Sequence, residues 1–233
     1  MVKKELEVII MKKLMDRLYD NIDEAKAFEL SFTNFVYSYE DLYWGDFEAT
    51  PCEHCGKRVQ HRDYIYPKAS CKKPTGILDT LQFGVSKDLR DDLIDRFDVT
   101  EKDFRPIYSK RGELVYYQIA PQHVMMPIHE ENGWIPKDPC PDCGVVIYQH
   151  NDFKNEKGEF YHYISQSALD NMHDFNVTYE RFRWHKPICV ISRRVYDFLT
   201  ERYPRTHYVP FFLREQDKKD GSVVPSDESQ NRP

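Results

Sequence analysis

Two Cys-x-x-Cys-Gly motifs are the clearest chemical feature of this sequence. The first runs from Cys52 to Gly56 and the second from Cys140 to Gly144, and a proline directly precedes each motif. Two residues between the cysteines let one tight turn direct both sulfurs at the same metal ion. Glycine after the second cysteine permits the positive φ that such a turn often needs. The two motifs together supply four soft thiolate ligands, the set that zinc binds in a tetrahedron.

We therefore predict one zinc ion per chain, bound by Cys52, Cys55, Cys140 and Cys143. Such a site is structural, because four thiolates leave no coordination position open for water or substrate. The two pairs lie far apart in the sequence. The metal is thus expected to hold the start of one half of the chain against the start of the other half.

Three alternatives to a single shared site stay open at this point. Each motif could serve a separate site, the first with His61 and Cys71 and the second with His150 or Cys189. The motifs could instead be thiol–disulfide active sites, although a redox pair normally opens a helix after a strand. They could also be packed turns that bind no metal. Cys189 lies in an apolar run, which favours a small buried side chain over a ligand.

Other catalytic motifs are absent from the sequence. It contains no His-Glu-x-x-His, no phosphate-binding glycine-rich loop, no dinucleotide fingerprint and no Gly-x-Ser-x-Gly. The run His129-Glu130-Glu131 has two interpretations, a metal-binding loop or a solvated acidic turn. We expect a protein without enzymatic activity.

Composition narrows the class of protein further. The 233 residues carry a formal net charge of −6, which argues against a protein that mainly coats nucleic acid. A local basic cluster is compatible with a phosphate contact or with an ordinary charged surface; its members are Arg181, Arg183, His185, Lys186, Arg193 and Arg194. No stretch approaches the roughly 18 apolar residues of a membrane span, and no signal peptide is evident, so we expect a cytoplasmic protein.

The chain also repeats an apolar pattern. One shift aligns Ser86 with Ser192 and Leu93 with Leu199, and a small gap then aligns Pro106 with Pro210. Each copy is predicted to be a strand, a serine helix cap, a helix with apolar i, i+4, i+8 spacing, and a proline-containing strand. The two serines are therefore interpreted as caps and not as nucleophiles.

The predicted fold class is α+β, with antiparallel sheets and a few helices. Two related strand–helix–strand halves, 44–125 and 133–215, are joined by the pair of zinc knuckles. An amphipathic helix over 3–26 precedes them, within a single domain over 1–215. The polar tail over 216–233 is predicted to be disordered. Period-two alternation predicts strands within 27–43, and Gly112 and Gly158 are predicted to lie in hairpin turns.

The order and spacing of these motifs resemble the double-CxxCG family of bacterial proteins, which contains immunity proteins of polymorphic toxin systems. The resemblance covers roughly residues 44–215. The matching features are Cys52-Glu53-His54-Cys55-Gly56, Tyr66-Pro67, Val85-Ser86, Cys140-Pro141-Asp142-Cys143-Gly144, and the closing unit from Ile191-Ser192 to Pro210.

The resemblance implies function by binding. An immunity protein protects its producer by gripping a cognate toxin domain and blocking it. The acidic excess suits a basic partner such as a nuclease domain, because opposite fields speed association. The partner expected is therefore a cognate protein toxin, with neither membrane nor nucleic acid as a target. The alternative function is that of a zinc-knuckle nucleic-acid-binding or regulatory protein.

Overall fold

The computed structural model describes residues 15, 18–31, 52, 54, 64–66, 84–109, 111–151, 153–182, 187–202 and 207–214. The described helices are η1 (Ile22–Glu24), α2 (Lys87–Arg96), η4 (Glu101–Asp103), α3 (His129–Asn132), α4 (Gln166–Asp170) and α5 (Arg193–Arg202). The described strands are β1 (Ala27–Ser31), β2 (Tyr64–Tyr66), β3 (Gly84–Val85), β4 (Phe104–Ser109), β5 (Leu114–Ile119), β6 (Ile135–Pro136), β7 (Tyr148–Gln149), β8 (Phe153–Lys154), β9 (Phe160–Ile164), β10 (Phe175–Val177), β11 (Cys189–Ser192) and β12 (His207–Leu213).

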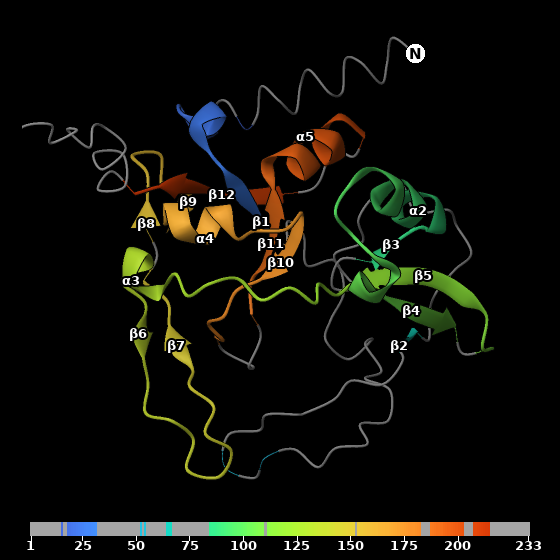
Figure 1. The fold of residues 1–233 in the computed structure, drawn as a ribbon, viewed down its shortest axis with the longest axis horizontal. Helices are drawn as coiled ribbons and strands as arrows, with labels where there is room; N and C mark the ends of the chain where they lie inside the picture. Colours follow the sequence, from blue (N-terminus) through green and yellow to red (C-terminus); the bar gives the residue numbers. More distant parts are fainter. Residues whose placement is uncertain are drawn as a thin grey trace, which may run out of the picture.

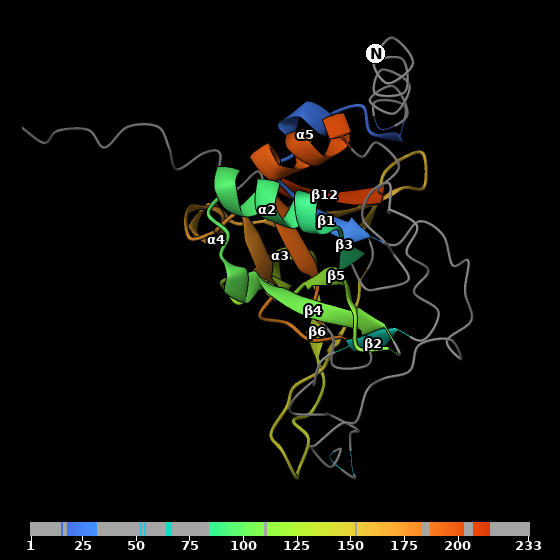
Figure 2. The same ribbon diagram turned by 90° about the vertical axis from the view of Figure 1, so that its right-hand side faces the viewer.

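The strands form two main sheets and one projecting pair. The larger sheet has the order β10-β11-β1-β12-β9-β8, the smaller has the order β2-β4-β5-β3, and β6 pairs with β7. Most pairs are antiparallel, but β9 runs parallel to β12 and β2 runs parallel to β4. Helices α2 and α5 lie together on the side of the molecule opposite to the tip of β6 and β7 (Figures 1 and 2). The predicted α+β class is confirmed, with parallel pairing at these two places.

Each sheet contains a strand–helix–strand unit with another strand placed between its two strands. In the smaller sheet, β5 lies between β3 and β4 and is antiparallel to both. In the larger sheet, β1 lies between β11 and β12 and is antiparallel to both. The two strands of each unit are therefore parallel to one another, which the connecting helix makes possible.

The helices begin where the serine pattern predicted. Ser86 Oγ accepts a hydrogen bond from Leu89 N at 3.2 Å, and Ser192 Oγ accepts one from Val195 N at 3.4 Å. Each bond satisfies an N–H group that the first helical turn leaves without a partner. Both cap predictions are confirmed. The apolar positions that follow each cap are buried, as the i, i+4 spacing requires.

Replacing Ser86 by alanine is expected to lower the free energy of unfolding by about 1 kcal/mol, because the Leu89 N–H loses its acceptor. Denaturant titration of the variant and the parent protein measures the change. Ser167→Ala is the matched control, since Ser167 is exposed within α4 and its replacement should change stability by less than about 0.5 kcal/mol. Equal stability of the Ser86 variant and its parent would contradict the cap.

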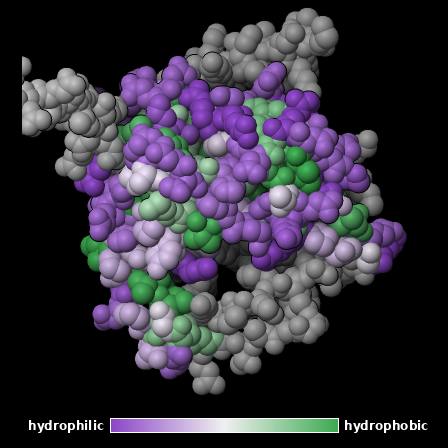
Figure 3. All heavy atoms as spheres, viewed as in Figure 1, coloured by the Kyte–Doolittle hydropathy of each residue, from purple (hydrophilic) through white to green (hydrophobic). Residues whose placement is uncertain are grey.

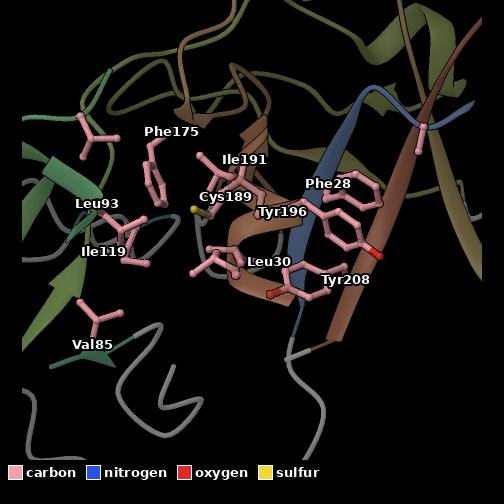
Figure 4. Packing of buried hydrophobic residues seen from close by; sticks show 14 of the residues in the cluster. Phe28, Leu30, Val85, Leu93, Ile119, Phe175, Cys189, Ile191, Tyr196 and Tyr208 are labelled. Carbon is pink, nitrogen blue, oxygen red and sulfur yellow. The ribbon is translucent and has the colours of Figure 1, made fainter. Parts of the chain in front are cut away.

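One hydrophobic core spans both sheets. It includes Leu89 and Leu93 of α2 together with Val195 and Leu199 of α5, all 1% exposed or less. Figure 4 shows Val85, Leu93 and Ile119 facing a group that contains Phe28, Leu30, Tyr196 and Tyr208. The ring of Phe28 stacks on that of Tyr196 with centroids 3.6 Å apart. Because side chains from both sheets fill the same core, the two sheets are expected to unfold together.

The predicted helix over 3–26 is wrong at its C-terminal end. Met15 and Leu18 are helical, but the chain forms only the short turn η1 before β1 begins. Lys26 N already donates to Phe211 O in the neighbouring strand. Ile22 and Ala25, two apolar residues of the pattern, are nevertheless buried, and residues 3–14 lie outside the described part of the chain. Sheet pairing therefore overrides the helical period over these residues, a common outcome of tertiary context.

Hairpins are present where the two glycines predicted them. Gly112 lies between β4 and β5, and Gly158 lies between β8 and β9. The strand predicted at the start of 27–43 is β1, and 32–43 lies outside the described residues. The predicted tail over 216–233 also lies outside them.

Candidate metal centre

The second cysteine motif is carried at the tip of an arm formed by β6 and β7. Lys137 N donates to Ile147 O, and Cys140 N donates to Val145 O, both at 2.9 Å. These bonds continue the pairing of the two strands up to the cysteine turn. Figures 1 and 2 show the arm pointing away from α2 and α5. The fold thus holds this motif away from the shared core.

The turn at the tip has the geometry expected of a metal knuckle. Gly144 N donates to Cys140 O at 2.8 Å and closes the turn around Pro141, Asp142 and Cys143. Gly144 has a φ of +66°, a conformation that L side chains rarely adopt. Glycine at this position is therefore required by the backbone, as the motif suggested.

Three of the four predicted ligands lie together. The sulfurs of Cys52, Cys140 and Cys143 are all within 4.8 Å of one another, which makes them a group that could hold a metal ion. Cys52 Sγ and Cys140 Sγ are 3.7 Å apart. Two sulfurs bound to one tetrahedral zinc ion at about 2.3 Å would lie about 3.8 Å apart. The measured separation therefore fits two ligands of one ion.

The three cysteines differ in exposure. Cys140 is buried, Cys52 is half-buried and Cys143 is exposed. The Asp142 carboxylate lies 3.9 Å from Cys52 Sγ, at the edge of the cluster. The cluster therefore combines a buried and an exposed cysteine.

The remaining cysteines of the sequence do not extend this cluster among the described residues. Cys55, His61 and Cys71 lie outside the described part of the chain. Cys189 is 9% exposed within the shared core, and burial raises the pKa of its thiol. Its predicted role as a small buried apolar side chain is confirmed. His150 stacks on the ring of Phe182, with centroids 3.9 Å apart.

His129 is considered in the sequence as a candidate metal ligand, but in the structure its ring contacts a carboxylate. It begins α3, and its Nδ1 lies 3.0 Å from Glu180 Oε1. The same carboxylate oxygen accepts hydrogen bonds from Ile128 N at 2.7 Å and from His129 N at 2.8 Å. Among the described residues, the cysteines are the group identified as able to hold a metal.

Glu180 anchors the base of the arm, and the sequence carries no signal of this role. Its side chain is fully buried, although glutamate in a charged stretch normally indicates an exposed position. Tyr148 of β7 lies close by: burial raises the pKa of its hydroxyl, and the charge of Glu180 raises it further. Tyr148 N also donates to Arg181 O at 2.8 Å. The buried carboxylate thus fixes the turn before α3 beside β7, the strand that follows the cysteine turn.

Two described members of the predicted basic cluster, Arg193 and Arg194, are engaged with acidic residues. Arg193 pairs with Asp197 at 3.0 Å and with Asp23 at 3.4 Å. Arg194 pairs with the buried Asp174. The segment 183–186 lies outside the described residues. On the face shown in Figure 3, hydrophilic residues predominate and apolar residues occur in small separate patches. These contacts favour the charged-surface interpretation over a nucleic-acid site.

Comparison with known proteins gives no relative for this chain. No protein-family model, no curated protein and no solved structure matches it. None of the helices in the described part of the chain combines the length and the apolar character needed to cross a lipid bilayer. Fold and site together define an α+β protein with a three-cysteine cluster at the tip of a projecting arm.

Proposed function

We propose that the three-cysteine cluster is part of a structural zinc site with Cys52, Cys55, Cys140 and Cys143 as its four ligands. The separation of 3.7 Å between the sulfurs of Cys52 and Cys140 supports this assignment. Cys55 follows Cys52 at the spacing that lets a knuckle supply its second thiolate. The ion fixes the tip of the arm to the segment that contains Cys52.

We further propose that the two halves of the chain are related copies, each with one knuckle. The strand–helix–strand units support this proposal, since α2 and α5 follow capping serines that the sequence shift aligns. The matching position of β5 and β1 inside the two units is a second argument. The metal then has ligands from both copies.

For the biological role, we propose an immunity protein of the cytoplasm that binds and neutralises a cognate bacterial toxin domain without catalysis. The observation that carries this proposal is the cluster of Cys52 of the first motif with Cys140 and Cys143 of the second, since these motifs carry the resemblance to the double-CxxCG family. The net charge of −6 adds a preference for a basic toxin, for example a nuclease domain.

Co-expression with the product of the adjacent toxin gene tests this role. The toxin domain alone should arrest growth of a bacterial host, and this chain should restore growth and co-purify with the toxin. Binding should weaken as salt is raised if opposite charge steers association. A matched control is an unrelated immunity protein of similar charge, which should give no protection. Growth arrest that persists in the presence of the folded chain, with no complex detected, would refute the proposal.

A further inference from the structure

The central strands of the two sheets occupy equivalent positions in detail. In each sheet the central strand pairs with both strands of the strand–helix–strand unit, and the outer neighbour of the second strand is parallel to it. The registers also correspond, as four pairs demonstrate: Phe28–Ile191 with Tyr117–Val85, and Phe28–Pro210 with Tyr117–Pro106. The shift that aligns the helices also aligns Val85 with Ile191, and the small gap noted in the sequence then aligns Pro106 with Pro210. Strands β1 and β5 thus fill the same place in two copies of one arrangement.

The contact between α2 and α5 repeats itself in the same way. The Arg96 guanidinium lies 4.0 Å from an oxygen of Asp92 and 5.5 Å from the centre of the Phe198 ring. The Arg202 guanidinium pairs with Asp92 and lies 4.8 Å from the centre of the same ring. The shift that aligns the capping serines exchanges Arg96 with Arg202 and Asp92 with Phe198. Each arginine therefore contacts the residue four positions before it in its own helix and the aligned residue of the other helix, and the two contacts that cross between the helices, Arg96 with Phe198 and Arg202 with Asp92, are those that a twofold axis would exchange.

We infer that the chain is a fused pair of one module, arranged about an approximate twofold axis, whose two copies have exchanged their first strands. The first module runs from β1 to β4, and the second from β5 to β12. β1 completes the sheet of the second module, and β5 completes the sheet of the first. This inference rests on the duplication proposed above. It adds β1 to the first copy, moves the boundary between the copies to the turn between β4 and β5, and adds the exchange of strands.

The exchange changes the role assigned to the metal. Two strands, each paired on both sides, already tie the modules together, and the shared core adds to this. The metal is therefore not needed to keep the modules associated. Its role is confined to fixing the tip of the arm against Cys52.

A cut in the turn between β4 and β5 tests the inference, because it separates the chain into the two modules. Arg111 and Gly112 are exposed in this turn, so a protease recognition sequence can be inserted there. After cleavage, the two fragments should elute as one particle of full mass, both with zinc and after treatment with a chelator. Hydrogen exchange should show the amides of β1 and β5 as well protected as in the uncut protein.

Other outcomes overturn the inference. Separation of the fragments on chelation would mean that the metal alone joins the modules. The fragments could also co-elute while the amides of β1 or β5 lose their protection from hydrogen exchange. That result would mean that the hydrophobic core alone joins the two modules and that neither strand crosses into the other module. Neither result bears on toxin neutralisation, and the metal content of the uncut variant reports separately on the zinc site.

An exchange of side chains across the axis provides an independent test in the uncut protein. Phe198→Asp alone should lower the melting temperature, because it removes the ring that both arginines contact. The double variant Asp92→Phe with Phe198→Asp rebuilds the same contacts at the positions related to them by the twofold axis. It should recover most of the loss caused by the Phe198 change. The single variant Asp92→Phe is measured as well. A double variant whose loss of stability equals the sum of the losses in the two single variants would contradict the twofold axis.

The matched control exchanges another aligned pair, Asp88→Arg with Arg194→Asp. Arg194 pairs with the buried Asp174, so this exchange replaces the ion pair by two neighbouring carboxylates. The control should lose stability without recovery. Recovery in the control as well would overturn the interpretation of the first exchange.

Discussion

Replacement of Cys140 by serine is expected to reduce bound zinc from one ion per chain to almost none. A serine hydroxyl does not replace a thiolate as a zinc ligand, and Cys140 is the buried member of the cluster. A metal that binds only the folded chain stabilises it by about 4 kcal/mol when its free concentration is 1,000 times its Kd. The free energy of unfolding should fall by about this amount. Elemental analysis and denaturant titration measure the two effects.

Cys189→Ala is the matched control for this experiment. Cys189 is buried in the shared core and not in the cluster, so the variant should keep its full zinc content. A Cys140→Ser variant with normal zinc and normal stability would exclude the site. A disulfide within either motif of the purified parent protein would instead support the redox alternative.

Replacement of Asp174 by asparagine is expected to lower the free energy of unfolding by about 2 kcal/mol, because the buried side chain loses its charge and its charge-assisted hydrogen bonds. Asp174 is 4% exposed. Its carboxylate accepts hydrogen bonds from Asp98 N at 2.7 Å, from Ser192 Oγ at 2.5 Å and from Arg194 Nε at 2.6 Å. These bonds link the segment after α2 to the start of α5. Urea titration at neutral pH measures the loss.

Asp197→Ala is the control for the Asp174 variant. Asp197 pairs with Arg193 one turn away on the exposed side of α5, with more than half of its side chain exposed. Its removal should cost less than about 0.5 kcal/mol, as for other exposed helix pairs. If both variants lost the same free energy of unfolding, the hydrogen bonds to Asp174 would stabilise the fold no more than an exposed ion pair does.

The same network makes stability depend on pH. Burial raises the pKa of Asp174, but the hydrogen bonds from Arg194, Ser192 and Asp98 N outweigh it, so the pKa lies below its ordinary value of 3.8. The folded protein therefore binds this proton less readily than the unfolded chain does. The stabilisation is fully present above pH 3.8 and is lost as the pH falls through the folded pKa. The stability difference between parent and Asp174→Asn should shrink below pH 3.8; a constant difference would contradict this.

Local patterns in the sequence predicted the parts of the fold that depend on neighbouring residues. The caps at Ser86 and Ser192 and the hairpins at Gly112 and Gly158 are short-range features, and all are present. The helix predicted to reach residue 26 failed, because β12 offers Lys26 a sheet partner that no local pattern records. The parallel pairing of β9 with β12 is likewise a long-range feature.

The candidate site divides in the same way. Cysteine spacing predicted four ligands, three of which the structure brings together. It could not reveal the arm that carries Cys140, nor Glu180 at the base of the arm. A single buried carboxylate is indistinguishable by type from the many exposed glutamates of this chain. Its role follows from the Ile128 and His129 N–H groups that reach it only in the folded protein.

The sequence distance between Cys52 and Cys140 has a consequence for metal retention. The two residues are separated by 88 positions. Bringing the ends of so long a loop together costs an unfolded chain about 4 kcal/mol of entropy. Without the fold, each knuckle would offer its own pair of thiolates at most, and such a chelate releases zinc readily. We therefore expect zinc to stay bound only while the whole chain is folded. Any substitution that unfolds the protein enough to separate the two knuckles should release the ion.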